Sequence, residues 1–118
     1  MESGKGAELR ERAFEFGCEV LALHRFLFER EPTLRQTTKQ AANAATSVGA
    51  NLEEADAGQS TADFISKCNI ALKEAREARY WLRMIARFYK SDRLDALVQE
   101  STEIVAILTT IVKKSRNK

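Results

Sequence analysis

Apolar residues recur every three or four positions along almost the whole of this chain. The first such segment has apolar residues at positions 9, 13, 16, 20, 23 and 27, which is the spacing of one helix face. No segment shows the strict apolar–polar alternation of a half-buried strand. This spacing predicts an all-α fold in which each helix buries one apolar stripe against the others.

Turn signals divide the pattern into four helices. The first ends near Arg30, because the residue before Pro32 avoids helical angles. The second, third and fourth stripes cover residues 34–55, 64–89 and 94–111, and Gly58 follows the second. Candidate N-caps of the third and fourth helices are Ser60 or Thr61 and Ser91 or Asp92. Short links between long helices predict an antiparallel up-down-up-down four-helix bundle.

The composition is that of a single helical domain. The chain has 118 residues, of which 44% are hydrophobic and only one is proline. We predict a disordered N-terminal tail at 1–6, one four-helix-bundle domain at 7–115 and a basic C-terminal tail at 116–118. No apolar run is long enough for a signal peptide or a membrane span, so we expect a cytoplasmic protein without a membrane partner.

Two helices carry more apolar residues than one core stripe needs. Each has a second row with a spacing of seven residues, formed by Phe14, Leu21 and Phe28 in the first helix and by Val98, Val105 and Val112 in the last. Self-association is one use of such rows, and it predicts a homo-oligomer. The alternative is that the rows only widen the core stripe.

The stretch SVGANLEEA places poor helix formers in the second helix. Ser47, Gly49 and Asn51 each disfavour a helix interior. A seam of small residues would let a neighbouring helix come close, so that packing offsets the cost of Gly49. Ser47 and Asn51 are four residues apart and could bond to each other or to another helix, which would fix the register. These three residues are therefore candidates for helix packing and assembly.

Residues that carry catalysis or bind metals are scarce. His24 is the only histidine, so no catalytic triad and no Glu-x-x-His metal site can be built. Glu53, Glu54 and Asp56 point in different directions around a helix and favour a solvated face over an ion site. We expect no catalytic residue, no metal and no cofactor, and hence no enzyme.

The two cysteines show no metal-binding or redox spacing. Cys18 and Cys68 fall on apolar stripes of a chain that we expect in a reducing compartment. We therefore predict two buried thiols that act as small hydrophobic side chains.

One charged pattern runs along a helix. Basic residues recur with a spacing of three or four over about 20 Å of the third helix, namely Arg76, Arg79, Arg83, Arg87 and Lys90. This stripe is a candidate nucleic-acid-binding surface, with RNA or DNA as the partner. The alternative is a solvated face on which Glu74 and Glu77 pair with the basic residues, in keeping with a net charge of only +2.

Two aromatic residues lie next to this stripe. Tyr80 and Trp81 could stack on nucleic-acid bases. We expect instead that they pack against a neighbouring helix or subunit, because large aromatic side chains dominate helical interfaces. Trp81 is therefore a fourth candidate for helix packing and assembly.

Two segments resemble one bacterial family. The run QAANAATSVGANLEEA (40–55) is similar to the QLRRAAVSIPSNIAEG signature of the 23S rRNA intervening-sequence proteins, also called S23-type proteins. The run DFISKCNIALKEAREARYWLRMI (63–85) resembles their second signature, the F…IA…E…YWL segment. The matching residues are Asn51, Glu54, Phe64, Ala71, Glu74, Glu77 and the triplet Tyr80-Trp81-Leu82.

This resemblance implies a non-enzymatic four-helix bundle that assembles as a ring, commonly a homopentamer, and whose role is poorly defined. Where the family signature has a basic pair, this chain has Ala42 and Asn43, and it has Glu53-Glu54-Ala55 where the signature ends in Ala-Glu-Gly. Both differences make the second helix less positive. They leave the third helix and the C-terminal tail as the candidate nucleic-acid contacts.

We therefore expect a cytoplasmic, self-assembling protein that acts by binding protein or nucleic acid. A related branch implied by the resemblance gives the alternative function. In that branch, bundles of similar architecture serve diversity-generating retroelements as nucleic-acid-binding accessory subunits of a reverse transcriptase.

Overall fold

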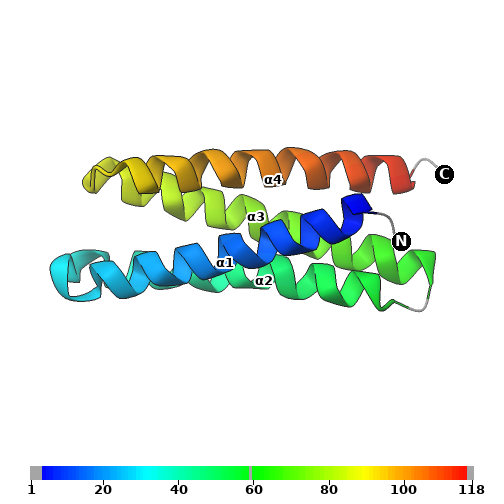
Figure 1. The fold of residues 1–118 in the computed structure, drawn as a ribbon, viewed down its shortest axis with the longest axis horizontal. Coiled ribbons are helices and arrows are strands. Elements are labelled where there is room, and N and C mark those ends of the chain that lie inside the picture. The colour runs from blue at the N-terminus through cyan, green and yellow to red at the C-terminus, as the bar shows by residue number, and fades with distance from the viewer. Residues whose placement is uncertain (1–3, 59, 117–118) are drawn as a thin grey trace.

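A computed structural model describes residues 4–58 and 60–116 as a bundle of long helices. The helices are α1 (Gly4–Arg30), α2 (Arg35–Asp56), α3 (Thr61–Phe88) and α4 (Asp92–Arg116), and a short 3-10 helix η1 (Pro32–Leu34) precedes α2. Figure 1 shows the α1–α2 and α3–α4 links at one end of the bundle and the α2–α3 link at the other. The predicted all-α four-helix bundle is confirmed.

The helix boundaries follow the local sequence signals. Pro32 occupies the first turn of η1, where its missing N–H costs nothing, and α1 ends two residues earlier as predicted. The Ser60 hydroxyl accepts a hydrogen bond of 3.1 Å from the backbone N–H of Asp63 and caps α3. The Ser91 hydroxyl accepts one of 3.3 Å from the backbone N–H of Leu94 and caps α4.

The domain limits differ slightly from the prediction. α1 begins at Gly4, so residues 4–6 of the predicted tail are helical. Residues 1–3 lie outside the described residues. α4 ends at Arg116, one residue beyond the predicted domain limit, and the remainder of the basic tail, residues 117–118, lies outside the described residues.

The apolar stripes of the four helices form one core. The side chains of Phe16, Val48, Leu82 and Ile104 are at most 2% exposed, and each belongs to the predicted stripe of its helix. Thr38 and Ser101 are the buried polar residues of the described chain. Their hydroxyls donate hydrogen bonds to the backbone carbonyls of Arg35 and Val98 respectively, at 3.2 and 2.7 Å.

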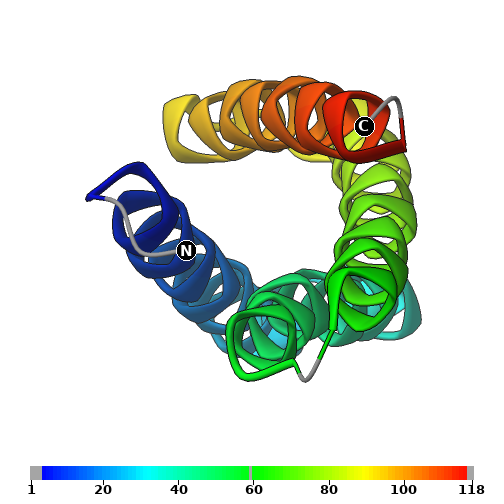
Figure 2. The ribbon, with the colours of Figure 1, turned by 90° about the vertical axis from the view of Figure 1, so that its right-hand side faces the viewer.

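The four helices are not packed equally. Seen end-on, they follow one another around a common axis in the order α1, α2, α3, α4 (Figure 2). α2 packs extensively against α1 and α3, and α3 against α4, whereas α1 and α4 have few residues in contact. The seam between the first and the last helix is therefore the most open one, and both cavities described below are lined by these two helices.

Candidate functional site

The outer face of α3 carries an exposed row of arginines. Arg76, Arg83 and Arg87 are all exposed, and they are separated by seven and four residues, which places them on one side of the helix. None of the three makes an ion pair or a side-chain hydrogen bond with another described residue. From Arg76 to Arg87 the row is about 17 Å long. We call these three residues the arginine row.

Two members of the predicted basic stripe have other roles within the chain. Arg79 is half-buried, and its Nε donates a hydrogen bond of 3.1 Å to the Thr102 hydroxyl of α4. Arg79 therefore joins α3 to α4 and does not lie in the row. Lys90 lies beyond the end of α3, where its Nζ donates to the backbone carbonyl of Ala86 at 3.3 Å, an arrangement that suits the negative end of a helix dipole.

Glu74 and Glu77 form no ion pair with the arginine row in the described structure. Glu77 accepts a hydrogen bond of 3.1 Å from the Trp81 indole N–H. Glu74 is half-buried, and its pKa is raised by burial and by the nearby Glu77, although Lys73 opposes the shift. Neither carboxylate forms an ion pair with Arg76 or Arg79 in the described structure. Lys73, another basic residue of this helix, does interact with Glu74, so the solvated face remains the alternative to a nucleic-acid contact.

Tyr80 and Trp81 differ in their surroundings. Trp81 is partly buried and packs against the core, as expected for a helix-packing residue. Tyr80 stands edge-on to Trp81, with 5.1 Å between ring centroids, and remains 51% exposed. It lies four residues after Arg76 and three before Arg83, so one aromatic ring is exposed within the arginine row. Within a single chain, only Trp81 packs as the sequence predicts.

The polar residues of α2 bond within their own helix. The Asn51 side-chain amide donates to the backbone carbonyl of Ser47 at 2.9 Å, and the Ser47 hydroxyl donates to the carbonyl of Asn43 at 3.0 Å. Neither side chain reaches another helix of the chain. Of the two alternatives, the described chain shows the bond between the two residues, which joins the Asn51 amide to the Ser47 carbonyl within α2. A bond to another copy of the chain stays a prediction.

Glycines do bring α1 and α2 together, although the tightest contact is not at Gly49. A Cβ added to Gly49 would lie 3.6 Å from backbone atoms of Ala13 and Phe14, which is ordinary contact. A Cβ on Gly17 would lie only 3.3 Å from the Thr46 Cα. Gly17 is the residue that sequence reasoning missed. Gly17 lies four residues after Ala13 and next to the apolar stripe of α1. This spacing could have indicated a close contact with another helix.

The second apolar rows of α1 and α4 differ in burial. Val98 and Val105 pack partly buried against the core and Val112 is buried, so the row of α4 widens the core stripe. On α1, the exposed fractions are 61% for Phe14, 52% for Leu21 and 41% for Phe28. These three side chains, which we call the α1 apolar row, remain on the surface.

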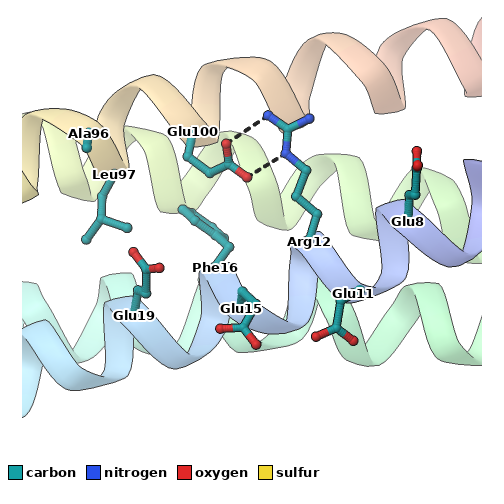
Figure 3. A pocket seen from close by; sticks show the side chains of 9 residues that line it. All are labelled: Glu8, Glu11, Arg12, Glu15, Phe16, Glu19, Ala96, Leu97 and Glu100. Atoms are coloured by element: carbon teal, nitrogen blue, oxygen red, sulfur yellow. Dashed lines mark hydrogen bonds and ion pairs between the residues drawn. The ribbon is translucent and has the colours of Figure 1, made fainter.

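A groove between α1 and α4 is acidic, and Arg12 reaches across it to Glu100 (Figure 3). The guanidinium of Arg12 donates two hydrogen bonds, of 2.6 and 2.8 Å, to the carboxylate of Glu100, and a further one to Glu103. These contacts are a direct link between the first and the last helix. Glu103 also accepts from the Gln99 amide, and both interactions lower the pKa of Glu103.

Further titratable groups link neighbouring helices of the described chain. The His24 Nδ1 lies 2.6 Å from the Thr38 hydroxyl, which ties α1 to α2. Asp56 forms an ion pair with Arg10. Within the ranges 4–58 and 60–116, no three His, Cys, Asp or Glu side chains are placed to hold a metal ion.

The two cysteines lie in different environments. Cys68 is buried as predicted, and burial raises its pKa to about 11. The prediction for Cys18 is wrong, because this thiol is exposed. It lies between Phe14 and Leu21 along the α1 apolar row, on the side of the helix that faces away from the core.

Comparisons with known proteins identify the family. The model of the 23S rRNA-intervening sequence protein family matches residues 5–110. A crystal structure of a protein of unknown function from the S23 ribosomal protein family of Bacteroides thetaiotaomicron VPI-5482 has a TM-score of 0.81 and 38% sequence identity to this chain. The match covers 89% of this chain and 98% of that one.

A search of curated proteins finds no match to the chain, and the similar crystal structure is of a protein whose function is unknown. In the described part of the molecule, none of the helices has the length and apolar character needed to cross a membrane. The family match extends over nearly all of the described bundle, including the arginine row and the α1 apolar row. The chain belongs to the 23S rRNA-intervening sequence protein family.

Proposed function

We propose that this chain is a non-enzymatic, self-assembling protein that binds nucleic acid through the arginine row of α3. The observation that carries this proposal is the exposure of Arg76, Arg83 and Arg87 without an ion pair to any described residue. Arginines that are not neutralised by the chain itself are available to phosphate oxygens, which they can contact through several N–H groups.

The dimensions of the row suit a phosphate backbone. Its length of about 17 Å compares with about 3.4 Å of helix axis per phosphate of one strand, so the row can face several phosphates at once. The exposed ring of Tyr80 lies among the arginines, and an aromatic ring in a basic surface can stack on an unpaired base. Single-stranded regions of RNA are therefore the favoured target.

Ribosomal RNA is the first RNA to test, because the family takes its name from sequences that interrupt 23S rRNA. α2 contributes little to such binding. Ala42 is buried, Asn43 is exposed but uncharged, and Glu53 and Glu54 add negative charge to the exposed surface of this helix. The last turn of α4 offers Lys113, Lys114 and Arg116 as additional cations.

Self-assembly would use the α1 apolar row. Three large apolar side chains that are each more than 40% exposed lose contact with water when they are covered, and this favours association by about 25 cal/mol per Å² buried. The resemblance to the family makes a homopentamer the assembly to test. In a ring, each copy repeats the arginine row, so modest single-site binding becomes strong through multivalency.

Nucleic-acid binding is tested with a triple variant, Arg76→Gln, Arg83→Gln and Arg87→Gln. Fluorescence anisotropy would follow a labelled, single-stranded 23S rRNA fragment across a salt series. Because each phosphate contact contributes about 0.7 to the salt dependence of single-strand binding, the triple variant should lower the slope of log K against log salt by about 2. Its affinity at low salt should fall in parallel.

The matched control removes the same charge elsewhere, with Lys39→Gln, Lys67→Gln and Arg93→Gln. These residues lie on α2, α3 and α4 and make no ion pair with any described residue. Equal losses of binding in the two triple variants would refute a specific role of the arginine row, as would unchanged binding in the first. Unrelated RNA and DNA as competitors separate a ribosomal role from the accessory role in a reverse-transcriptase complex, which needs no preference for 23S rRNA.

A further inference from the structure

A second cavity opens at the end of the bundle where α1 begins and α4 ends. Its volume is about 710 Å³, and residues of all four long helices line it. Most of the surface is apolar, because the inner wall is formed by Leu9, Leu52, Phe64, Cys68, Ile107 and Ile111. A volume of this size is within the usual range of about 300 to 1,000 Å³ for sites of small molecules.

The cavity exists because this end of the core is not filled. Leu9 is 8% exposed, and Phe64 and Ile111, which line the cavity with it, are only partly buried. α1 and α4 touch sparsely, and the Arg12–Glu100 ion pair that joins them lies to one side of the cavity and not across it. A ligand could therefore enter between the two helices without breaking that pair.

The rim of the cavity has a net positive charge. Arg10 forms an ion pair of 3.1 Å with Asp56, which uses only part of its guanidinium. Lys114 is exposed and pairs with no other residue of the described chain. Among the charged residues that line the cavity, two are basic and one is acidic. The rim thus favours an anionic group, and the inner wall favours an alkyl chain.

We propose that this cavity binds a free single-chain amphiphile with an anionic head group, of which a medium-length fatty acid is the simplest example. The alkyl chain lies along Leu9, Leu52 and Ile111, and the carboxylate lies at the rim between Lys114 and Arg10. Burial of each methylene group contributes to binding, and the head group stays partly in water, where its charge costs little.

The lining disfavours polar ligands. Its hydroxyl groups belong to Thr61 and Thr110, which are exposed, and to the half-exposed Ser115. No hydroxyl lies on the inner wall, so a sugar or a nucleobase would bury donors and acceptors without partners. An alkyl chain loses no hydrogen bond there, which is why the cavity selects an apolar tail.

Cys68 gives a direct measure of occupancy, because its thiol is on the inner wall. The protein with Cys18→Ser keeps Cys68 as its single thiol. We would measure the rate of modification by methyl methanethiosulfonate at pH 9 with increasing laurate, held below its micelle concentration. We expect laurate to slow the modification at least about fivefold and to do so saturably, with one site per chain.

Two variants locate the two parts of the ligand by calorimetric titration. Ile111→Trp fills the cavity and should weaken laurate binding at least tenfold. Lys114→Gln should weaken laurate about threefold, the size of a single exposed charge pair, and leave uncharged 1-dodecanol unaffected. Lys113→Gln is the matched control, because Lys113 is exposed but does not line the cavity, and it should bind laurate as the unchanged protein does.

The proposal is wrong if laurate neither binds nor protects Cys68. It is also wrong if the Ile111→Trp variant, with an unchanged helical circular-dichroism spectrum, still binds laurate normally. In that case the fatty acid would be held elsewhere, for example on the α1 apolar row. Equal effects of Lys114→Gln and Lys113→Gln would overturn the placement of the head group.

Discussion

Alanine at Gly17 and alanine at Gly49 should change the stability of the chain in different directions. Both glycines are inside helices, where alanine favours the helix by about 1 kcal/mol. At Gly49 the added Cβ would make ordinary contacts of 3.6 Å with Ala13 and Phe14. At Gly17 it would lie 3.3 Å from the Cα of Thr46, a backbone atom that cannot rotate away. The two positions share a helix pair and differ in the space available.

The expected magnitudes follow from these distances. Gly49→Ala should raise the free energy of unfolding by about 1 kcal/mol, since nothing opposes the gain in helix propensity. Gly17→Ala obtains the same gain but forces α1 and α2 apart by a few tenths of an ångström, and overpacking of this kind costs about 1 to 3 kcal/mol. The net effect of Gly17→Ala should therefore lie between about 0 and 2 kcal/mol of destabilisation.

Urea unfolding followed by circular dichroism at 222 nm measures both changes. A change of 1 kcal/mol should also shift the melting temperature by about 3 to 6 °C in a domain of this size. Ala50→Gly is a useful control, because Ala50 is exposed on α2 next to Gly49. It should cost about 1 kcal/mol, which calibrates helix propensity in this helix.

Equal stabilisation by both alanines would refute the reasoning, because it would mean that the close approach at Gly17 places no limit on the helix pair. Destabilisation by Gly49→Ala would be informative in another way. Since the single chain has room for that methyl group, the loss would have to come from a second copy packed against Gly49, as the assembly hypothesis for this residue requires. Sedimentation of the same variant would then reveal a smaller assembly.

The remaining predictions concern charge and assembly. Glu74→Gln should stabilise the chain slightly at pH 7, because burial and Glu77 raise the pKa of Glu74. The ionised form of Glu74 is therefore less favourable in the folded chain, although solvent screening keeps the effect small. This gain should shrink as the pH falls through the raised pKa of Glu74 in the folded chain and should be lost below the unfolded pKa of a glutamate, near 4.5. A urea series at pH 7 and pH 4 would measure the change. Leu21→Lys, in the α1 apolar row, should reduce the mass of the assembly in light scattering, whereas Ala22→Lys, also exposed, should not. An unchanged mass for Leu21→Lys would exclude the row as the contact between copies.

The sequence predicted the fold well because its signals are local. Helix caps need only a serine hydroxyl within three residues of an N–H group, as Ser60 and Ser91 provide. Pro32 removes one N–H and fixes one angle wherever the chain goes. The stripes around Phe16 and Leu82 are buried as their spacing requires. Each of these features depends on neighbours along the helix, which the sequence contains.

The candidate surfaces were predicted less completely, because their properties depend on the opposing helix. Arg79 has the same spacing as its neighbours, but Thr102 on α4 accepts its hydrogen bond and removes it from the exposed row. The seven-residue rows of α1 and α4 look alike in sequence. Only the placement of α4 against α3 decides that Val98 packs against the core while Leu21 is left in water.

By itself, the sequence determined that this protein is a bundle of four helices, which stripe of each helix faces the core, and to which family its signatures belong. Only the tertiary structure decided that Gly17 is the glycine of closest contact between α1 and α2, that Cys18 is exposed, and that an apolar cavity opens between α1 and α4. The physical reason is that a helix fixes the direction of each side chain around its own axis. What that side chain meets is fixed by the distance and rotation of a helix far away along the chain.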